Sequence, residues 1–151
     1  MNPKTVKVVS IAAGVAVLAV AGVYFATREP ERKAEPPKPG IFVDAPQADA
    51  VVSFPLMIKG RVTGEGDWIA FEGHAGTVQA FDAQGPISEI GALLISDDWT
   101  ILPASFSASL GTEDNVSRIK ANTGYLLFKN ENPSGEQGRN REFRVPVRYE
   151  K

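Results

Sequence analysis

The sequence contains no cysteine among its 151 residues. This absence excludes disulfide bonds, thiolate metal ligands and cysteine nucleophiles. It also excludes attachment through a lipid-modified cysteine, so any membrane attachment has to come from the polypeptide itself. The single histidine, His74, excludes a histidine-rich metal site.

Basic residues are scarce in the C-terminal three quarters of the chain. The formal net charge is −2 overall, and residues 41–151 carry ten Lys and Arg against fifteen Asp and Glu, a net charge of −5. Nucleic-acid-binding domains normally carry a basic patch or stripe. We therefore expect no nucleic-acid partner.

The stretch Val8–Thr27, "VVSIAAGVAVLAVAGVYFAT", carries no charge. As a helix it would span about 30 Å, the thickness of the hydrocarbon core of a bilayer. We predict that residues 1–27 form a membrane anchor, with a signal-anchor helix over about 8–27. A cleaved signal peptide is the alternative, because Ala19–Ala21 has the form of a cleavage site, but the apolar run continues to Ala26 and exceeds the usual length.

Basic residues flank this run on both sides, so the charge rule for orientation is weak here. The short N-terminus carries two lysines and no acid, and exported proteins begin in the same way. We predict a single-pass protein of the cytoplasmic membrane with its C-terminal domain outside. A cytoplasmic domain on an inverted anchor is the alternative.

Residues 28–40, "REPERKAEPPKPG", contain four prolines and charges of both signs. Such a composition favours extended polyproline II backbone and cannot build a core. We predict a Pro-rich charged linker that reaches up to about 40 Å. A domain boundary is expected near Gly40.

Three runs within residues 41–151 alternate between apolar and polar side chains, the pattern of strands with one buried face: "LMIKGRV", "SFSASL" and "EFRVPVRYE". The runs "IFV", "TVQAF", "EIGALLI" and "YLLFK" complete the set of predicted strands. Clusters of Gly, Asp and Asn separate them, as turns require. These features predict an all-β domain, an immunoglobulin-like antiparallel β-sandwich of about seven strands, with a small barrel as the alternative.

Two details of this domain follow from single residues. Pro146 has no N–H, so the last strand should lie at an edge or leave its Pro146 side unpaired. Without disulfides the core depends on large apolar side chains. The predicted core residues are Trp68, Phe71, Trp99, Phe106, Leu127, Phe143 and Val145.

Four segments in order resemble the Gmad2 immunoglobulin-like domain associated with bacterial spore germination proteins. They are "GRVTGEGDWIAFEG", "FDAQG", "DDWTILPASFSASL" and "LLFKNENPSG". The residues that carry the likeness are Gly60, Trp68, Phe71, Glu72, Asp82, Gly85, Asp98, Trp99, Phe106, Asn132, Pro133, Ser134 and Gly135. The resemblance implies an immunoglobulin-like sandwich on an exported or membrane-tethered envelope protein, and it implies no catalytic residues.

The long polar loop "NENPSGEQGRN" between the last two strands is the candidate binding site. Its residues Asn132, Pro133, Ser134 and Gly135 have the chemistry of a tight turn, which a returning hairpin needs in any case. Loops at the end of an immunoglobulin fold also commonly bind partners. We therefore predict these four residues as a partner-binding loop, with a purely structural turn as the alternative.

Other residues offer weaker candidate sites. Exposed tryptophans stack on sugar rings, but the core interpretation of Trp68 and Trp99 is favoured. The aspartates of "SDDW", taken with Asp82 and Glu89, lack the spacing of a calcium loop, so no metal site is predicted. His74 could belong to a Ser-His-Asp arrangement, but the sequence has no GxSxG nucleophile elbow, so a loop histidine without a catalytic role is favoured.

The sequence thus predicts a non-catalytic, membrane-anchored envelope protein without catalytic residues, cofactors or metals. Its expected partners are the membrane, through the N-terminal helix, and another envelope protein or cell-wall glycan. One alternative is an envelope hydrolase acting on cell-wall glycan or esters, for which Glu72 and Asp98 are the carboxylates to consider. The other is a purely structural spacer.

Overall fold

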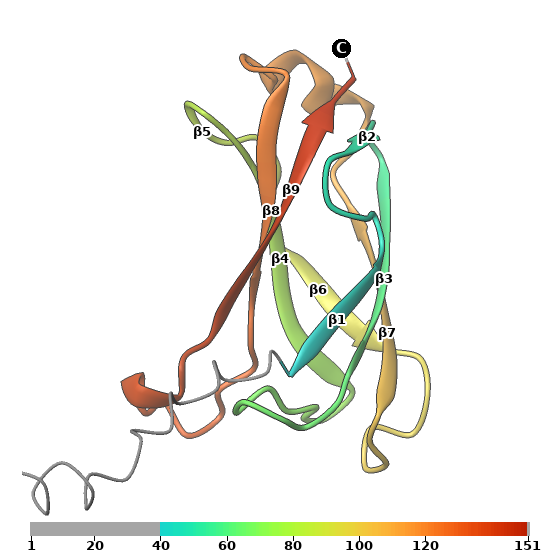
Figure 1. Ribbon diagram of the computed structural model, residues 1–151, viewed down its shortest axis with the longest axis vertical. Helices are drawn as coiled ribbons and strands as arrows, with labels where there is room; N and C mark the ends of the chain where they lie inside the picture. The colour runs from blue at the N-terminus through green and yellow to red at the C-terminus, as the bar shows by residue number, and fades with distance from the viewer. Residues whose placement is uncertain (1–39, 151) are drawn as a thin grey trace, which may run out of the picture. The chain divides into compact units, whose positions relative to one another are not determined.

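The computed structural model describes residues 40–150, which form an all-β domain with two short 3₁₀ segments (Figure 1). The elements are β1 Ile41–Ala45, β2 Ala50–Val52, β3 Leu56–Val62, β4 His74–Asp82, β5 Gly85–Pro86, β6 Gly91–Ile95, β7 Ala104–Leu110, η1 Glu113–Arg118, β8 Thr123–Lys129, η2 Gln137–Arg139 and β9 Glu142–Tyr149. The all-β prediction is confirmed.

The predicted anchor at 8–27 and the linker before Gly40 lie outside the described residues. Within residues 40–150, no helix has the length and apolar character needed to cross a membrane.

All strands belong to one curled sheet with the order β1-β3-β7-β6-β4-β8-β9-β2, and β5 pairs with β4. Neighbouring strands are antiparallel except β2, which runs parallel to β9. The two halves of the sheet meet at β6 and β7, which share only the pairs Leu94–Ser107 and Ile95–Phe106. The terminal strands β1 and β2 both contribute to the same core, through Ile41 and Val52. The sheet therefore curls round so that its two ends face one core.

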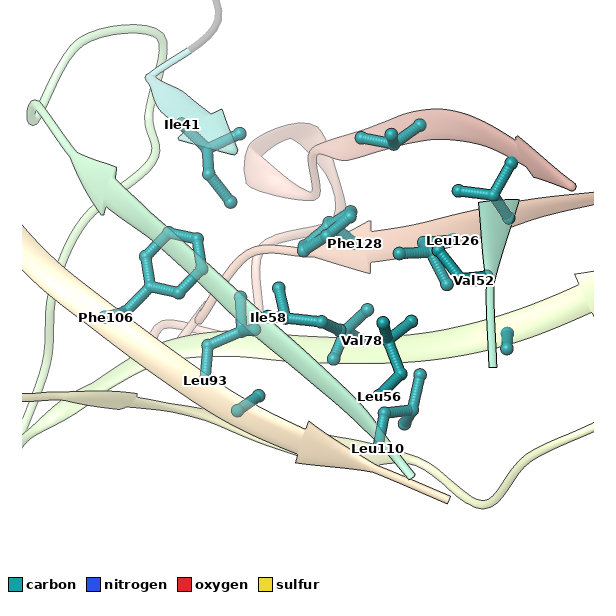
Figure 2. Packing of buried hydrophobic residues seen from close by; sticks show 14 of the residues in the cluster. Ile41, Val52, Leu56, Ile58, Val78, Leu93, Phe106, Leu110, Leu126 and Phe128 are labelled. Atoms are coloured by element: carbon teal, nitrogen blue, oxygen red, sulfur yellow. The ribbon is translucent and has the colours of Figure 1, made fainter. Parts of the chain in front are cut away.

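The core fills the inside of the curled sheet (Figure 2). Strand alternation places its members, since β3 and β7 bury every second residue as the sequence predicts. Phe106 and Val145 lie in the core as expected, and Trp68 is only 2% exposed. The indole Nε1 of Trp68 donates a hydrogen bond to the carbonyl of Ala75 at 2.8 Å, which satisfies the one polar group of the side chain.

The core prediction is wrong for Trp99, which is 39% exposed in the loop between β6 and β7. Phe71 and Phe143 are half-buried, and Leu127 is buried but lies outside the main cluster. The run "WTILP" has no period-two alternation, so the sequence offered no face on which to place Trp99.

Strand β9 runs beside β8 along its whole length and beside β2 over its last residues. The carbonyl of Pro146 accepts a hydrogen bond from the Asp49 amide at 2.7 Å, so the missing N–H of Pro146 lies on the same side as β2. Beta2 begins one residue later, opposite Val147. Strand β9 is therefore not an edge strand, because β2 pairs with its Pro146 side from Val147 onward and Pro146 lies just before that ladder begins.

Candidate functional site

Three long loops lie at one end of the curled sheet, which we call the loop end (Figure 1). They join β3 to β4 (63–73), β6 to β7 (96–103) and β8 to β9 (130–141). Strand β1 also begins at this end. The predicted binding residues thus lie at the same end of the domain as Trp99, which was wrongly predicted to lie in the core.

The predicted residues 132–135 form a tight turn at the tip of the β8–β9 loop. The amide of Gly135 donates to the carbonyl of Asn132 at 3.1 Å, and Gly135 has a φ of 69°. Asn first, Pro second and Gly fourth is the preferred sequence of a type I turn, and the positive φ suits glycine. The backbone role expected for these residues is present, and Pro133, Ser134 and Gly135 are exposed.

Asn132 holds this tip together through side-chain hydrogen bonds. Its side-chain amide donates to the Glu136 carbonyl at 2.9 Å and to Oδ1 of Asn140 at 2.7 Å. Its Oδ1 accepts from the Ser134 hydroxyl at 2.8 Å. Asn132 is therefore a framework residue, and the turn residues that follow it form the surface.

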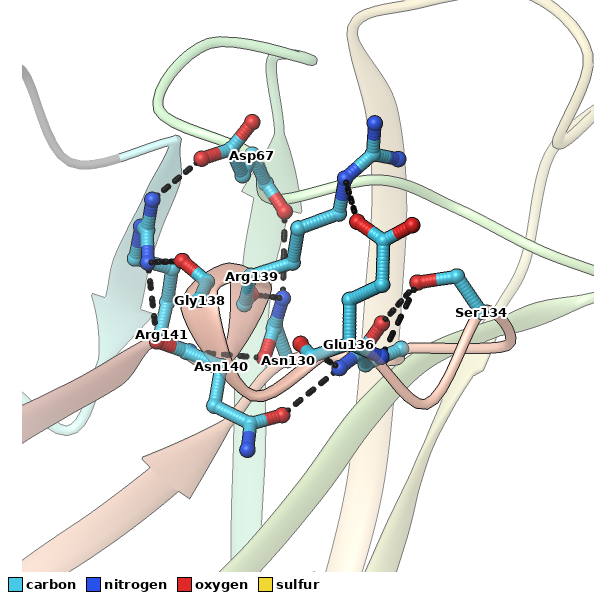
Figure 3. Close-up of polar contacts among 9 residues, drawn as sticks. Asp67, Asn130, Ser134, Glu136, Gly138, Arg139, Asn140 and Arg141 are labelled. Atoms are coloured by element: carbon cyan, nitrogen blue, oxygen red, sulfur yellow. Dashed lines mark hydrogen bonds and ion pairs between the residues drawn. The ribbon is translucent and has the colours of Figure 1, made fainter.

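A second asparagine ties the β8–β9 loop to the β3–β4 loop (Figure 3). The side-chain amide of Asn130 donates to the carbonyls of Asp67 and Arg139, and its Oδ1 accepts from the Arg141 amide at 2.9 Å. An ion pair between Arg141 and Asp67 reinforces the same junction. The two loops are consequently fixed to one another before any partner binds.

A hollow of about 60 Å³ opens at this junction. Drug-sized ligands occupy pockets of about 300–1,000 Å³, so this hollow holds only a few waters or one small side chain. The geometry suits contact with a macromolecular surface better than enclosure of a small molecule.

The β6–β7 loop is shaped by two aspartates. The Asp98 carboxylate accepts hydrogen bonds from the Thr100 hydroxyl at 2.6 Å and from the Thr100 amide at 2.9 Å. The Asp97 carboxylate accepts from the Ser105 amide at 2.9 Å. Hydrogen bonds from Thr100 lower the pKa of Asp98, and those from Ser105 lower the pKa of Asp97, so both stay charged near neutral pH.

This loop presents apolar side chains to solvent. Ile101 is 66% exposed, and Leu102 is also exposed. The Trp99 ring meets the Phe71 ring edge-on at 6.4 Å between centroids, and Leu102 covers Gly64, where an added Cβ would lie 2.5 Å from Leu102 Cδ1. Trp99 and Leu102 therefore pack the β6–β7 loop onto the β3–β4 loop.

The remaining sequence candidates are dispersed. His74 is exposed at the start of β4, where its backbone pairs with Phe71. Asp82 ends the same strand, at the opposite end from Asp98, and its carboxylate is occupied by backbone N–H groups. No group of three metal-binding side chains occurs among residues 40–150. Glu72 is exposed in the β3–β4 loop with a φ of 47°.

A second hollow, of about 230 Å³, lies between β1 and the first half of β9. Its lining is mainly apolar and includes Ile41, Val43, Phe143, Val145 and Pro146. It marks the place where the curled sheet stays open, because no backbone ladder joins β1 to β9.

Comparisons with protein-family models, with curated proteins and with solved structures give no match to this chain.

Proposed function

We propose that this chain is a non-catalytic, membrane-anchored envelope protein whose domain binds a macromolecular partner through the loop end. The observation that carries the proposal is the pre-ordered β8–β9 loop. Side-chain hydrogen bonds from Asn130 and Asn132 hold its backbone, while Pro133, Ser134 and Gly135 stay exposed. A loop ordered before binding loses less conformational entropy when it meets a partner.

The strand order supports an immunoglobulin-like arrangement of the domain. In immunoglobulin folds, strands A, B and E are neighbours in one sheet, and strands C, F and G are neighbours in the other. The order β1-β3-β7 matches the first set in chain sequence, and β4-β8-β9 matches the second. The likeness of "GRVTGEGDWIAFEG" and "NPSG" to the Gmad2 domain agrees with this assignment.

The chemistry of the carboxylates supports binding over hydrolysis. A general acid needs a carboxyl group whose pKa is raised, usually by burial. Hydrogen bonds from Thr100 lower the pKa of Asp98 instead, and Asp98 and Glu72 are both exposed.

The placement in the cell rests on the uncharged run Val8–Thr27 and the proline-rich segment after it. In our proposal the run spans the cytoplasmic membrane once, and the linker presents the domain outside it. The partner is then another envelope protein or the cell-wall glycan.

The proposal can be tested with the full-length protein in mild detergent as bait for solubilised envelope. We would compare the wild type with a double variant, Pro133→Lys with Gly135→Asn, which alters the tip and spares Asn130 and Asn132. An added Cβ at Gly135 meets nothing within 4 Å, and Asn tolerates a positive φ, so this variant should fold.

The matched control is Ala83→Lys with Gln84→Asn, two exposed positions in the β4–β5 turn at the opposite end. We expect the tip variant to lose at least about tenfold in recovered partner, and the control variant to equal the wild type. Equal recovery by all three proteins would refute the role of the β8–β9 loop.

A further inference from the structure

Four apolar side chains gather on two loops of the loop end, beside the β8–β9 loop. We call them the apolar patch, formed by Phe71 of the β3–β4 loop and by Trp99, Ile101 and Leu102 of the β6–β7 loop. Phe71 is half-buried, but Trp99, Ile101 and Leu102 are exposed. Burying such side chains would stabilise the fold, so the exposure of three neighbouring apolar side chains needs another reason. Tryptophan is also among the side chains most enriched in binding hot spots.

The apolar patch is held in place by its own loops. Asp98 fixes the turn at Trp99 through Thr100, and Asp97 fastens the far end of the loop to the Ser105 amide. The contacts between Trp99 and Phe71 and between Leu102 and Gly64 join the two loops. Hydrogen bonds of Asp97 and Asp98 hold the β6–β7 loop, and packing contacts join it to the β3–β4 loop. The apolar patch is therefore a fixed surface.

The same two loops hold an excess of acid equal to that of the whole domain. Residues 63–73 and 96–103 contain five acidic residues and no Lys or Arg, a net charge of −5, which is also the net charge of residues 41–151. The acidic residues are Glu65, Asp67, Glu72, Asp97 and Asp98.

Only one of these acids is neutralised by a neighbour within the described part of the chain. Asp67 pairs with Arg141, whereas the ion pairs of residues 40–150 include none of the other four carboxylates. Among residues 40–150, the result is an apolar patch with a rim of negative charge that is not paired with Lys or Arg. Its complement is a surface with apolar side chains at the centre and positive charges around them.

We infer that the apolar patch is a docking surface for a polypeptide that presents apolar side chains flanked by Lys or Arg. The sign of the rim disfavours anionic phospholipid and nucleic acid, because both would be repelled by four carboxylates. This inference rests on the proposed function and adds the chemistry of the partner, at residues separate from the tip of the β8–β9 loop.

The test uses the full-length protein in mild detergent and three labelled probes. The first is a short amphipathic peptide of leucine and lysine. In the second, glutamate replaces every lysine, and in the third, serine replaces every leucine. Binding is followed by fluorescence anisotropy at low and moderate salt. The signal of each peptide with protein-free detergent micelles is subtracted, and the protein variants are compared under the same conditions.

We expect the leucine–lysine peptide to bind at least about tenfold more tightly than either altered peptide, with weaker binding as salt rises. The double variant Trp99→Ala with Ile101→Ser should lower its affinity at least about tenfold. Glu65→Gln with Glu72→Gln should weaken binding at low salt and flatten the salt dependence. Ile90→Ser, at a 66% exposed position outside these loops, should change nothing.

Four outcomes would overturn the inference. Three of them are equal binding of the lysine and glutamate peptides, no binding of the leucine–lysine peptide, and an affinity that Trp99→Ala with Ile101→Ser leaves unaltered in a folded protein. A fourth is assignment of the patch to the bilayer, which would appear as quenching of Trp99 by brominated phosphatidylcholine in reconstituted vesicles and would vanish in Trp99→Phe.

The two proposals fail separately. If the peptides do not bind but the Pro133 variant still loses its partner, the inference is wrong and the proposed function stands. If the peptides bind through Trp99 while the tip variant captures its partner normally, recognition belongs to the apolar patch and not to the β8–β9 loop.

Discussion

Replacing Asp82 by asparagine should strongly destabilise the domain. Asp82 ends β4 and is only 5% exposed. Its Oδ1 accepts hydrogen bonds from the amides of Gln84 at 2.8 Å and Gly85 at 3.2 Å, and its Oδ2 accepts from those of Lys120 at 2.7 Å and Ala121 at 3.0 Å. One carboxylate therefore joins the β4–β5 turn to the segment that enters β8.

The size of the effect follows from these four bonds. Burial raises the pKa of Asp82, but the four backbone N–H groups outweigh it and leave the pKa below its ordinary value. Asparagine keeps one acceptor oxygen and turns its NH₂ group toward two N–H donors. Two N–H groups then lose their partner, at about 1–3 kcal/mol each, so we expect a loss of about 3 kcal/mol. For a domain of roughly 100 residues this lowers Tm by about 15 °C.

The assay is urea and thermal unfolding of the full-length protein in mild detergent, followed by the fluorescence of the buried Trp68. Because the folded-state pKa of Asp82 is depressed, its contribution is complete above the ordinary value of 3.8 and is lost as pH falls through the folded-state pKa. The wild type should lose stability on acidification from about pH 5 downward, and Asp82→Asn should lose less.

Glu89→Gln is the control, since the Glu89 side chain is 86% exposed and its ion pair with Arg118 should contribute little. A loss below about 1 kcal/mol in Asp82→Asn, or an acid dependence equal to that of the wild type, would refute this reasoning.

Three further predictions concern packing and the loop end. Trp68→Ala should lower the free energy of unfolding by about 3–5 kcal/mol, and Trp99→Ala by about 1 kcal/mol or less, when unfolding is measured by circular dichroism. Equal losses would contradict the burial of Trp68 and the exposure of Trp99. Gly76→Ala should cost at least about 3 kcal/mol because its φ is 119° and a Cβ would lie 2.0 Å from a β8 carbonyl oxygen, whereas Gly73→Ala, with a φ of 82° and open space, should cost about 1 kcal/mol in the same urea titration. Asn130→Ala should cost about 1–2 kcal/mol and speed amide hydrogen exchange throughout the β8–β9 loop; unchanged exchange would mean that Asn130 does not order it.

Only part of the candidate site could be predicted from the sequence. The turn at Asn132–Gly135 was predictable because Pro and Gly impose local backbone angles that need no distant partner. The bonds from Asn130 to Asp67 were not, because they join residues 63 positions apart. The exposure of Trp99 was equally hidden, since a tryptophan in a non-alternating run has no face that the sequence can assign.

Alternation by itself determined three strands of this domain and their inward faces. The inward faces of β3, β7 and β9 could be assigned because side chains of an extended chain point to opposite sides in turn, and only one side of each strand is apolar. The acid excess was equally available from counting charges.

The tertiary structure decided everything that depends on pairing between distant segments. Strand β2 has only three residues, too few for a recognisable alternation of apolar and polar side chains. It is a strand because Ala50–Val52 pairs in parallel with β9. The joining of all strands into one curled sheet depends on two residue pairs between β6 and β7. Only the fold brings residues 63–73 and 96–103 together, so that apolar side chains and an excess of acidic residues share one surface. Neighbouring residues determine local backbone conformation, whereas contacts across the sheet depend on how the whole chain buries its apolar faces.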